Sequence, residues 1–195
     1  MNATATPVIS PPAAALAQYS TTAKVFHWVT AVAFLAQFPI GFTMVQMSAG
    51  STASFLFSLH ESLGFLILWL ALLRLFNRFR SPVVRKNSRL ARWHIRASIA
   101  AHYTIYALLI LVPLTGWMGV SAYNSLELFG TFSLPAILPP DQARAVWILW
   151  THGLLAFSLM ALVAVHVGFA MQGYLDGPDD DSTAGSPENS PASAR

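Results

Sequence analysis

Histidine is the residue type in this chain best suited to chemistry. Six histidines are present, and five lie in long apolar stretches: His27, His60, His102, His152 and His166. Ionisable side chains are rare in such stretches and suggest function by default. The sixth, His94, lies in a basic segment and is interpreted as a solvated residue. The five apolar-segment histidines are therefore candidate ligands for a metal or a metal-containing cofactor.

The last two histidines have an informative spacing. His152 and His166 are fourteen residues apart in one apolar run. On an α-helix, fourteen steps of ~100° bring the second side chain to within about 40° of the first, roughly 21 Å further along. Both imidazoles therefore face the same way at opposite ends of one helix.

The composition indicates what kind of element positions these residues. The chain has 195 residues, of which 55% are hydrophobic and 10% charged, against about 25% charged in a soluble domain. This places it among membrane proteins. It has no cysteine, which excludes disulfides, iron–sulfur clusters, thiolate zinc sites and covalently attached haem.

Four segments are long enough to span a bilayer by the criterion of roughly 20 apolar residues. They are Val25–Val45, Ser54–Leu73, Ala97–Tyr123 and Ala145–Leu175. We predict an all-α fold, an integral membrane four-helix bundle covering residues 20–175. Residues 1–19, rich in Pro, Ala and Thr, and residues 176–195, acidic and rich in Ser and Pro, are predicted to be disordered tails.

The basic residues predict the orientation. Seven of the eleven Lys and Arg residues lie between residues 78 and 96, whereas Arg144 is the only one between the third and fourth segments. By the positive-inside rule, both termini and this basic loop are predicted to be cytoplasmic. The loop is interpreted as a topology signal and a surface for anionic membrane lipid, and we predict no nucleic-acid partner.

With this topology the histidines fall into two layers. His27, His102 and His166 lie near the cytoplasmic side, and His60 and His152 near the opposite side. A haem in a helical bundle needs two axial imidazoles at equal depth on facing helices. We therefore predict two haems about 20 Å apart. His60 is the partner available to His152, while His166 could pair with either His27 or His102.

Neighbouring residues agree with this interpretation. Arg74 follows His60 by fourteen residues, so it faces the interior at the depth of the cytoplasmic layer. There it could pair with a haem propionate, or it could simply extend to the membrane surface from a helix end. Gly64, one turn from His60, and Gly153, next to His152, are expected to leave room for a porphyrin face.

Several motifs resemble the prokaryotic cytochrome b561 family of four-helix di-haem membrane proteins. They are FHW in the first segment, LHESLGF and LLRLFNRF in the second, AHYTIYALLILVPLTGW in the third and WTHGLLAFSLMALVAVH in the fourth. The resemblance extends from about residue 19 to residue 176.

The resemblance implies that His27 and His166 hold the cytoplasmic haem b, and that His60 and His152 hold the periplasmic one. It further implies a multi-pass protein of the bacterial inner membrane that exchanges electrons with ubiquinone. Small stand-alone members resemble superoxide oxidases, which pass an electron from superoxide at the periplasmic face to ubiquinone. His102 is not an axial ligand in this pairing; a role near quinone or a propionate, and plain packing, both remain open.

Two other functions are compatible with the same residues. The chain could be the membrane anchor of a larger dehydrogenase or hydrogenase, receiving electrons from a redox protein rather than from superoxide. In a different class, the histidines could line a metal transporter. A metal transporter would be expected to have histidines that converge on one cavity with carboxylates nearby, yet Glu61 is the only carboxylate within a span.

Overall fold

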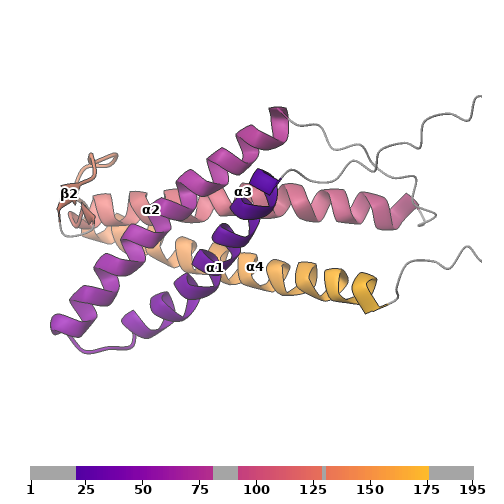
Figure 1. Ribbon diagram of the computed structural model, residues 1–195. Coiled ribbons are helices and arrows are strands. Elements are labelled where there is room, and N and C mark those ends of the chain that lie inside the picture. The colour runs from indigo at the N-terminus through magenta and orange to yellow at the C-terminus, as the bar shows by residue number, and fades with distance from the viewer. Residues whose placement is uncertain (1–20, 81–91, 129–130, 176–195) are drawn as a thin grey trace, which may run out of the picture.

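Four long helices make up almost all of the described structure. The computed structural model describes residues 21–80, 92–128 and 131–175. The helices are α1 (Thr21–Met44), α2 (Ser51–Arg80), α3 (Arg92–Tyr123) and α4 (Gln142–Leu175), and two short strands, β1 (Glu127–Leu128) and β2 (Phe132–Ser133), lie between α3 and α4 (Figure 1). The predicted tails lie outside the described residues.

Each helix is long and apolar enough to cross a membrane. All four predicted spans are confirmed: each helix begins a few residues before its predicted span, α1 ends one residue before Val45, and α2 continues past Leu73 to Arg80. Pro39 and Pro113 lie inside α1 and α3 without ending them. Many large apolar side chains are exposed, among them Val32, Phe55, Leu154 and Phe169. A surface of this kind is suited to lipid rather than to water.

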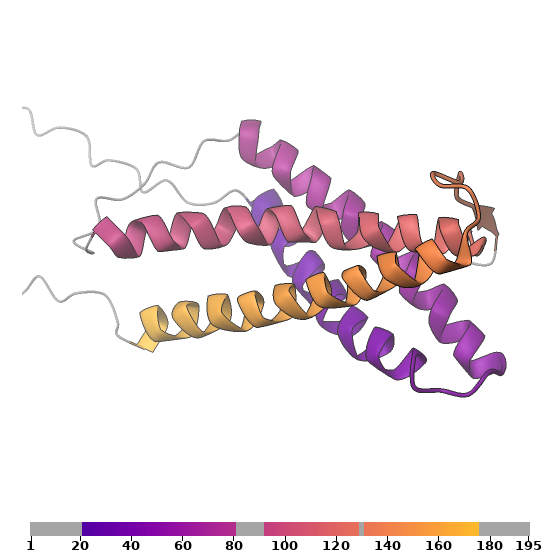
Figure 2. The same cartoon turned by 180° about the vertical axis from the view of Figure 1, so that it is seen from behind.

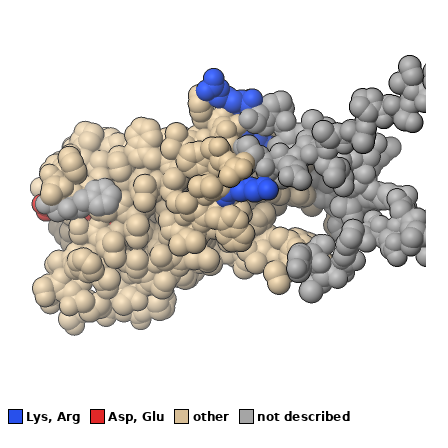
Figure 3. All heavy atoms as spheres, viewed as in Figure 1, with Lys and Arg blue, Asp and Glu red and all other residues tan. Residues whose placement is uncertain are grey.

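The helices form two antiparallel hairpins that cross at an angle. The α1–α2 hairpin runs obliquely across the α3–α4 hairpin, as both views show (Figures 1 and 2). The starts of α1 and α3 and the ends of α2 and α4 are directed toward one end of the molecule. Basic side chains gather toward that end and acidic ones are seen at the other (Figure 3). We call these the basic end and the outer end.

A small apolar core lies midway along the bundle. Its buried residues are Ile67 and Ala71 of α2, Leu109 of α3 and Leu159 of α4, with Phe34 of α1 packed against them. Leu159 is seven residues from both His152 and His166, Ile67 is seven from both His60 and Arg74, and Leu109 is seven from His102. Seven residues are nearly two helical turns, so the core separates the two layers of polar residues by similar distances on three helices.

The connection between α3 and α4 covers the outer end. β1 and β2 pair antiparallel, with Glu127 opposite Ser133. The buried hydroxyl of Ser121 accepts hydrogen bonds from the amides of Ile137 (2.9 Å) and Leu138 (3.0 Å) and donates to the Leu138 carbonyl (3.1 Å). One side chain at the end of α3 therefore holds the loop segment that contains Ile137 and Leu138 in place.

Candidate functional site

The outer layer brings two imidazoles face to edge. His60 of α2 and His152 of α4 have ring centres 6.0 Å apart and ring planes at 84°. With metal–nitrogen bonds of about 2 Å, two rings on opposite sides of one metal ion have centres roughly 6 Å apart. Two helices of different hairpins thus place their imidazoles at a ring spacing that is compatible with a shared metal ion.

His152 is held in the tautomer that leaves Nε2 free. Its Nδ1 lies 2.9 Å from the carbonyl oxygen of Val112 on α3. A carbonyl can only accept, so Nδ1 carries the proton and the lone pair lies on Nε2. Gly116, one turn further along α3, allows this approach, because a methyl group there would lie 3.2 Å from His152 Cε1.

His60 is wedged against α1. A Cβ at Gly41 would lie 2.7 Å from His60 Cε1 and 3.0 Å from its Nδ1, so only glycine lets the ring sit there. One turn earlier on α1, Gln37 Nε2 donates to the His60 carbonyl oxygen at 2.7 Å. His60 Nδ1 and Gln37 Oε1 are both buried, and neither has a hydrogen-bond partner within the described residues.

The inner layer receives one polar side chain from each helix. They are His27 of α1, Arg74 of α2, His102 of α3 and His166 of α4, and His27 lies within electrostatic range of the other three. Arg74 Nη2 donates to His27 Nδ1 at 3.1 Å, and its guanidinium carbon lies 5.4 Å from the centre of the Tyr106 ring. The structure therefore places Arg74 inside this layer, as its spacing from His60 predicts.

His102 and His166 are the two imidazoles in ring contact at this depth. Their centres are 5.1 Å apart at an interplanar angle of 88°, and His102 Nδ1 donates to the Ser98 carbonyl at 2.6 Å. His102 Nδ1 therefore carries a proton, and in the neutral imidazole the lone pair lies on Nε2. In contrast, a guanidinium can only donate, so His27 Nδ1 is an acceptor and its proton lies on Nε2. Metal binding by His27 Nε2 requires Arg74 to release Nδ1.

Several of these contacts have no simple signature in the sequence. Gln37 is a polar residue inside an apolar span, and that oddity is the signal that could have identified it. Gly41 and Gly116 are the glycines pressed against imidazoles, whereas Gly64 lies against Gln37, whose Nε2 would be 3.3 Å from an added Cβ. Gly153 faces open space, in keeping with the expectation that it leaves room beside His152.

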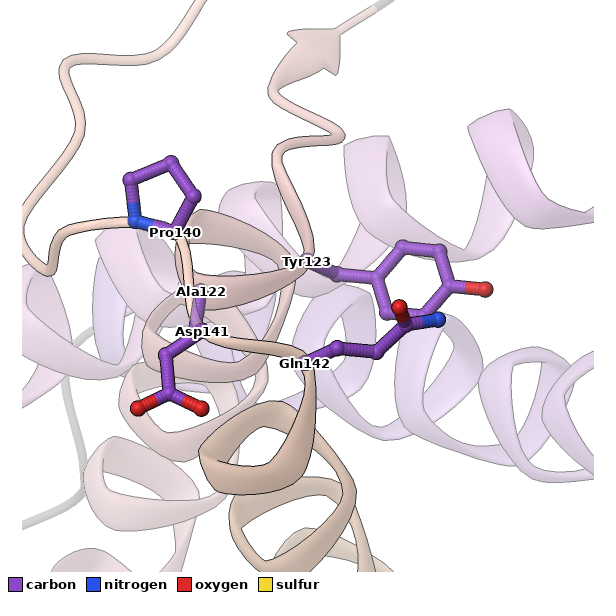
Figure 4. A pocket seen from close by; sticks show the side chains of 5 residues that line it. All are labelled: Ala122, Tyr123, Pro140, Asp141 and Gln142. Atoms are coloured by element: carbon purple, nitrogen blue, oxygen red, sulfur yellow. The ribbon is translucent and has the colours of Figure 1, made fainter.

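A further pocket in the described part of the chain lies away from the histidines. A shallow pocket of about 320 Å³ lies where α3 ends and α4 begins, lined by Ala122, Tyr123, Pro140, Asp141 and Gln142 (Figure 4). None of the histidines lines it. Within residues 21–80, 92–128 and 131–175, no three His, Asp or Glu side chains are grouped closely enough to form a metal site.

Comparison with known proteins identifies the family to which the sequence is similar. Residues 18–174 match the sequence model of the prokaryotic cytochrome b561 family. The chain is also 27% identical, over 165 residues, to cytochrome b561 homolog 2 of Escherichia coli (strain K12), an alignment that covers 84% of this chain and 88% of that protein.

Proposed function

The chain belongs to the prokaryotic cytochrome b561 family, and from that premise we propose that it binds two b-type haems and carries electrons between them and membrane quinone. Membership makes it a multi-pass membrane haem protein with a role in electron transfer. The haem number, the ligands, the quinone and the location in the bacterial inner membrane belong to the proposal.

The main support for the proposal is the geometry of the outer pair, His60 and His152. His60 and His152 have ring centres 6.0 Å apart, and the hydrogen bond from His152 Nδ1 to Val112 presents Nε2 as a ligand. A backbone carbonyl on the second ring nitrogen is the usual support for a metal-binding histidine. The residues of this layer therefore fit a haem that His60 and His152 would hold together.

The inner layer fits a second haem, but two ligand pairs are available there. His166 belongs to both pairs, and we propose His27 as its partner on the family resemblance. His102 is the competing ligand, because its ring faces His166 and its Nδ1 is already bonded to a carbonyl. If His27 is the ligand, Arg74 leaves its Nδ1 and becomes available to a carboxylate such as a propionate.

A haem iron supplies the one-electron chemistry by changing between its ferric and ferrous states. The chain contributes the positions of the two sites. If they hold the haems, His152 and His166 would set them roughly 21 Å apart along α4, with the apolar core around Leu159 between the two layers. Electrons thus have a route along the bundle between its two ends.

The donor is the least constrained part of the proposal. Superoxide is an anion and is guided by positive potential. The described outer end instead carries three carboxyl groups, of Glu61, Glu127 and Asp141, and its one guanidinium, Arg144, is paired with Asp141 at 3.1 Å. We therefore expect any reaction with superoxide to lack acceleration at low ionic strength. A redox protein as donor, with the chain as its membrane anchor, is the competing function.

The experiment that tests the proposal is purification in detergent with haem quantified per chain and reduced-minus-oxidised spectra recorded. Two low-spin b-type haems per chain are expected. Stopped-flow addition of superoxide with a soluble quinone then separates the two donors: quinone reduction supports superoxide, and inactivity together with a co-purifying polypeptide supports the anchor. A colourless protein from haem-sufficient cells would refute the proposal.

The inner ligand is settled by a matched pair of variants. His27→Ala is expected to lose the inner haem, while His102→Ala is expected to keep it with an altered potential. The reverse outcome would assign His102 as the ligand. In both variants the spectrum of the outer haem serves as the internal control.

A further inference from the structure

Two buried atoms in the outer layer lack partners, and they are complementary. His60 Nδ1 and Gln37 Oε1 are the buried side-chain atoms without a hydrogen bond among the described residues. A neutral histidine that binds a metal through Nε2 has its proton on Nδ1, which makes Nδ1 a donor. The amide oxygen of Gln37 can only accept. One unpaired donor and one unpaired acceptor therefore lie in the same buried layer.

The two residues are already joined. Gln37 Nε2 donates to the His60 backbone carbonyl at 2.7 Å, which fixes the amide group beside His60. The Nδ1–Cε1 edge of the imidazole faces α1, because these two atoms are the ones nearest to a Cβ built on Gly41. Gly41 is four residues after Gln37 and so lies on the same face of α1. The edge of the ring that carries Nδ1 thus faces the helix that carries the free acceptor.

Two glycines make this approach possible. A Cβ on Gly64 would lie 3.3 Å from Gln37 Nε2, and a Cβ on Gly41 would lie 2.7 Å from the His60 ring. Each side chain therefore rests where the opposite helix has no side chain of its own. α1 and α2 interlock through this contact at the depth of the outer imidazole pair.

We propose that Gln37 is a positioning residue for His60: its Nε2 holds the His60 carbonyl, and when His60 binds haem its Oε1 accepts a hydrogen bond from the Nδ1–H group. The inference rests on the proposed haem ligation by His60. An acceptor on the second ring nitrogen fixes the tautomer and the ring orientation and makes the ligand more basic. A more basic ligand favours ferric iron, so Gln37 lowers the midpoint potential of the outer haem.

The test compares Gln37→Leu, Gln37→Glu and the control Gln46→Leu in redox titrations of the purified full chain. Gln46 also donates its amide to a backbone carbonyl, that of Phe42, but it is exposed. Q37L removes the acceptor and Q37E keeps one. At the wild-type midpoint of the outer haem, the ratio of reduced to oxidised haem should rise about threefold in Q37L, or about 28 mV for a one-electron couple. In Q37E it should fall, and in Q46L it should not change.

Haem retention supplies the second readout. Loss of the outer haem from Q37L but not from Q37E supports the proposal, because the two variants differ in the acceptor. Equal midpoints in Q37L and Q37E, or loss of the outer haem from both, would assign Gln37 to helix packing alone and overturn it. The wild-type haem content is measured first: a wild type without the outer haem refutes the proposed function itself, whereas two haems with unresponsive Gln37 variants refute only this inference.

Discussion

Replacing Gly41 by alanine tests whether the His60 ring is held against α1. The new Cβ would lie 2.7 Å from His60 Cε1 and 3.0 Å from Nδ1, whereas carbon atoms in good contact are about 3.5–4.0 Å apart. The imidazole would have to retreat by about 1 Å, and overpacking of this kind costs about 1–3 kcal/mol. Since every 1.4 kcal/mol is tenfold in affinity, G41A should weaken binding of the outer haem by about 5- to 140-fold.

The assay is haem retention during detergent dilution, followed by the spectrum of each haem. Gly168→Ala is the matched control, because a Cβ on Gly168 of α4 meets nothing within 4 Å. G168A should keep the outer haem at the wild-type affinity. If G41A also kept the wild-type affinity, the close contact between Gly41 and His60 would have no part in ligand placement, and the reasoning would be refuted.

Two further predictions concern the outer layer, and a third concerns the loop between α3 and α4. His152→Ala should lose the outer haem and spare most of the inner one, and spectra showing equal loss of both in a folded protein would contradict the two-layer arrangement. Gly116→Ala should weaken the outer haem less than G41A does, because its Cβ would lie 3.2 Å from the His152 ring; a larger loss would reverse that ranking. Ser121→Ala should lower thermal stability by about 1–3 kcal/mol, because two amides lose their acceptor, with Ser158→Ala, an exposed helical serine, as the unaffected control in thermal unfolding.

Most of the predictions made from the sequence depended on helical periodicity. Residues spaced at multiples of seven lie on one face of a helix, so the depths of His60, Arg74, His152 and His166 could be inferred before their contacts were known. The four spans could also be predicted from the sequence, because each is a long apolar run with few charges. Both inferences concern one helix at a time.

Contacts between helices were harder to predict from the sequence. Gly41 contacts His60 because of how α1 is positioned along α2. The spacing of residues within α1 cannot predict that relative position. The same applies to Arg74, whose donation to His27 Nδ1 depends on two helices and on a tautomer. Sequence spacing leaves open whether His27 or His102 faces His166. The ring contact of His102 with His166 keeps both histidines as candidate partners.

The crossing of the two hairpins has a consequence for how the protein matures. α1 packs on α2 and α3 packs on α4, while the hairpins meet chiefly through α2 and α3. His60 and His152 belong to different hairpins, so a ligand that binds both adds its binding free energy to the association of the two halves. If His60 and His152 hold the haem as proposed, haem binding would link the two hairpins and stabilise the complete bundle. Haem supply in the cell would accordingly govern how long a newly made chain survives proteolysis.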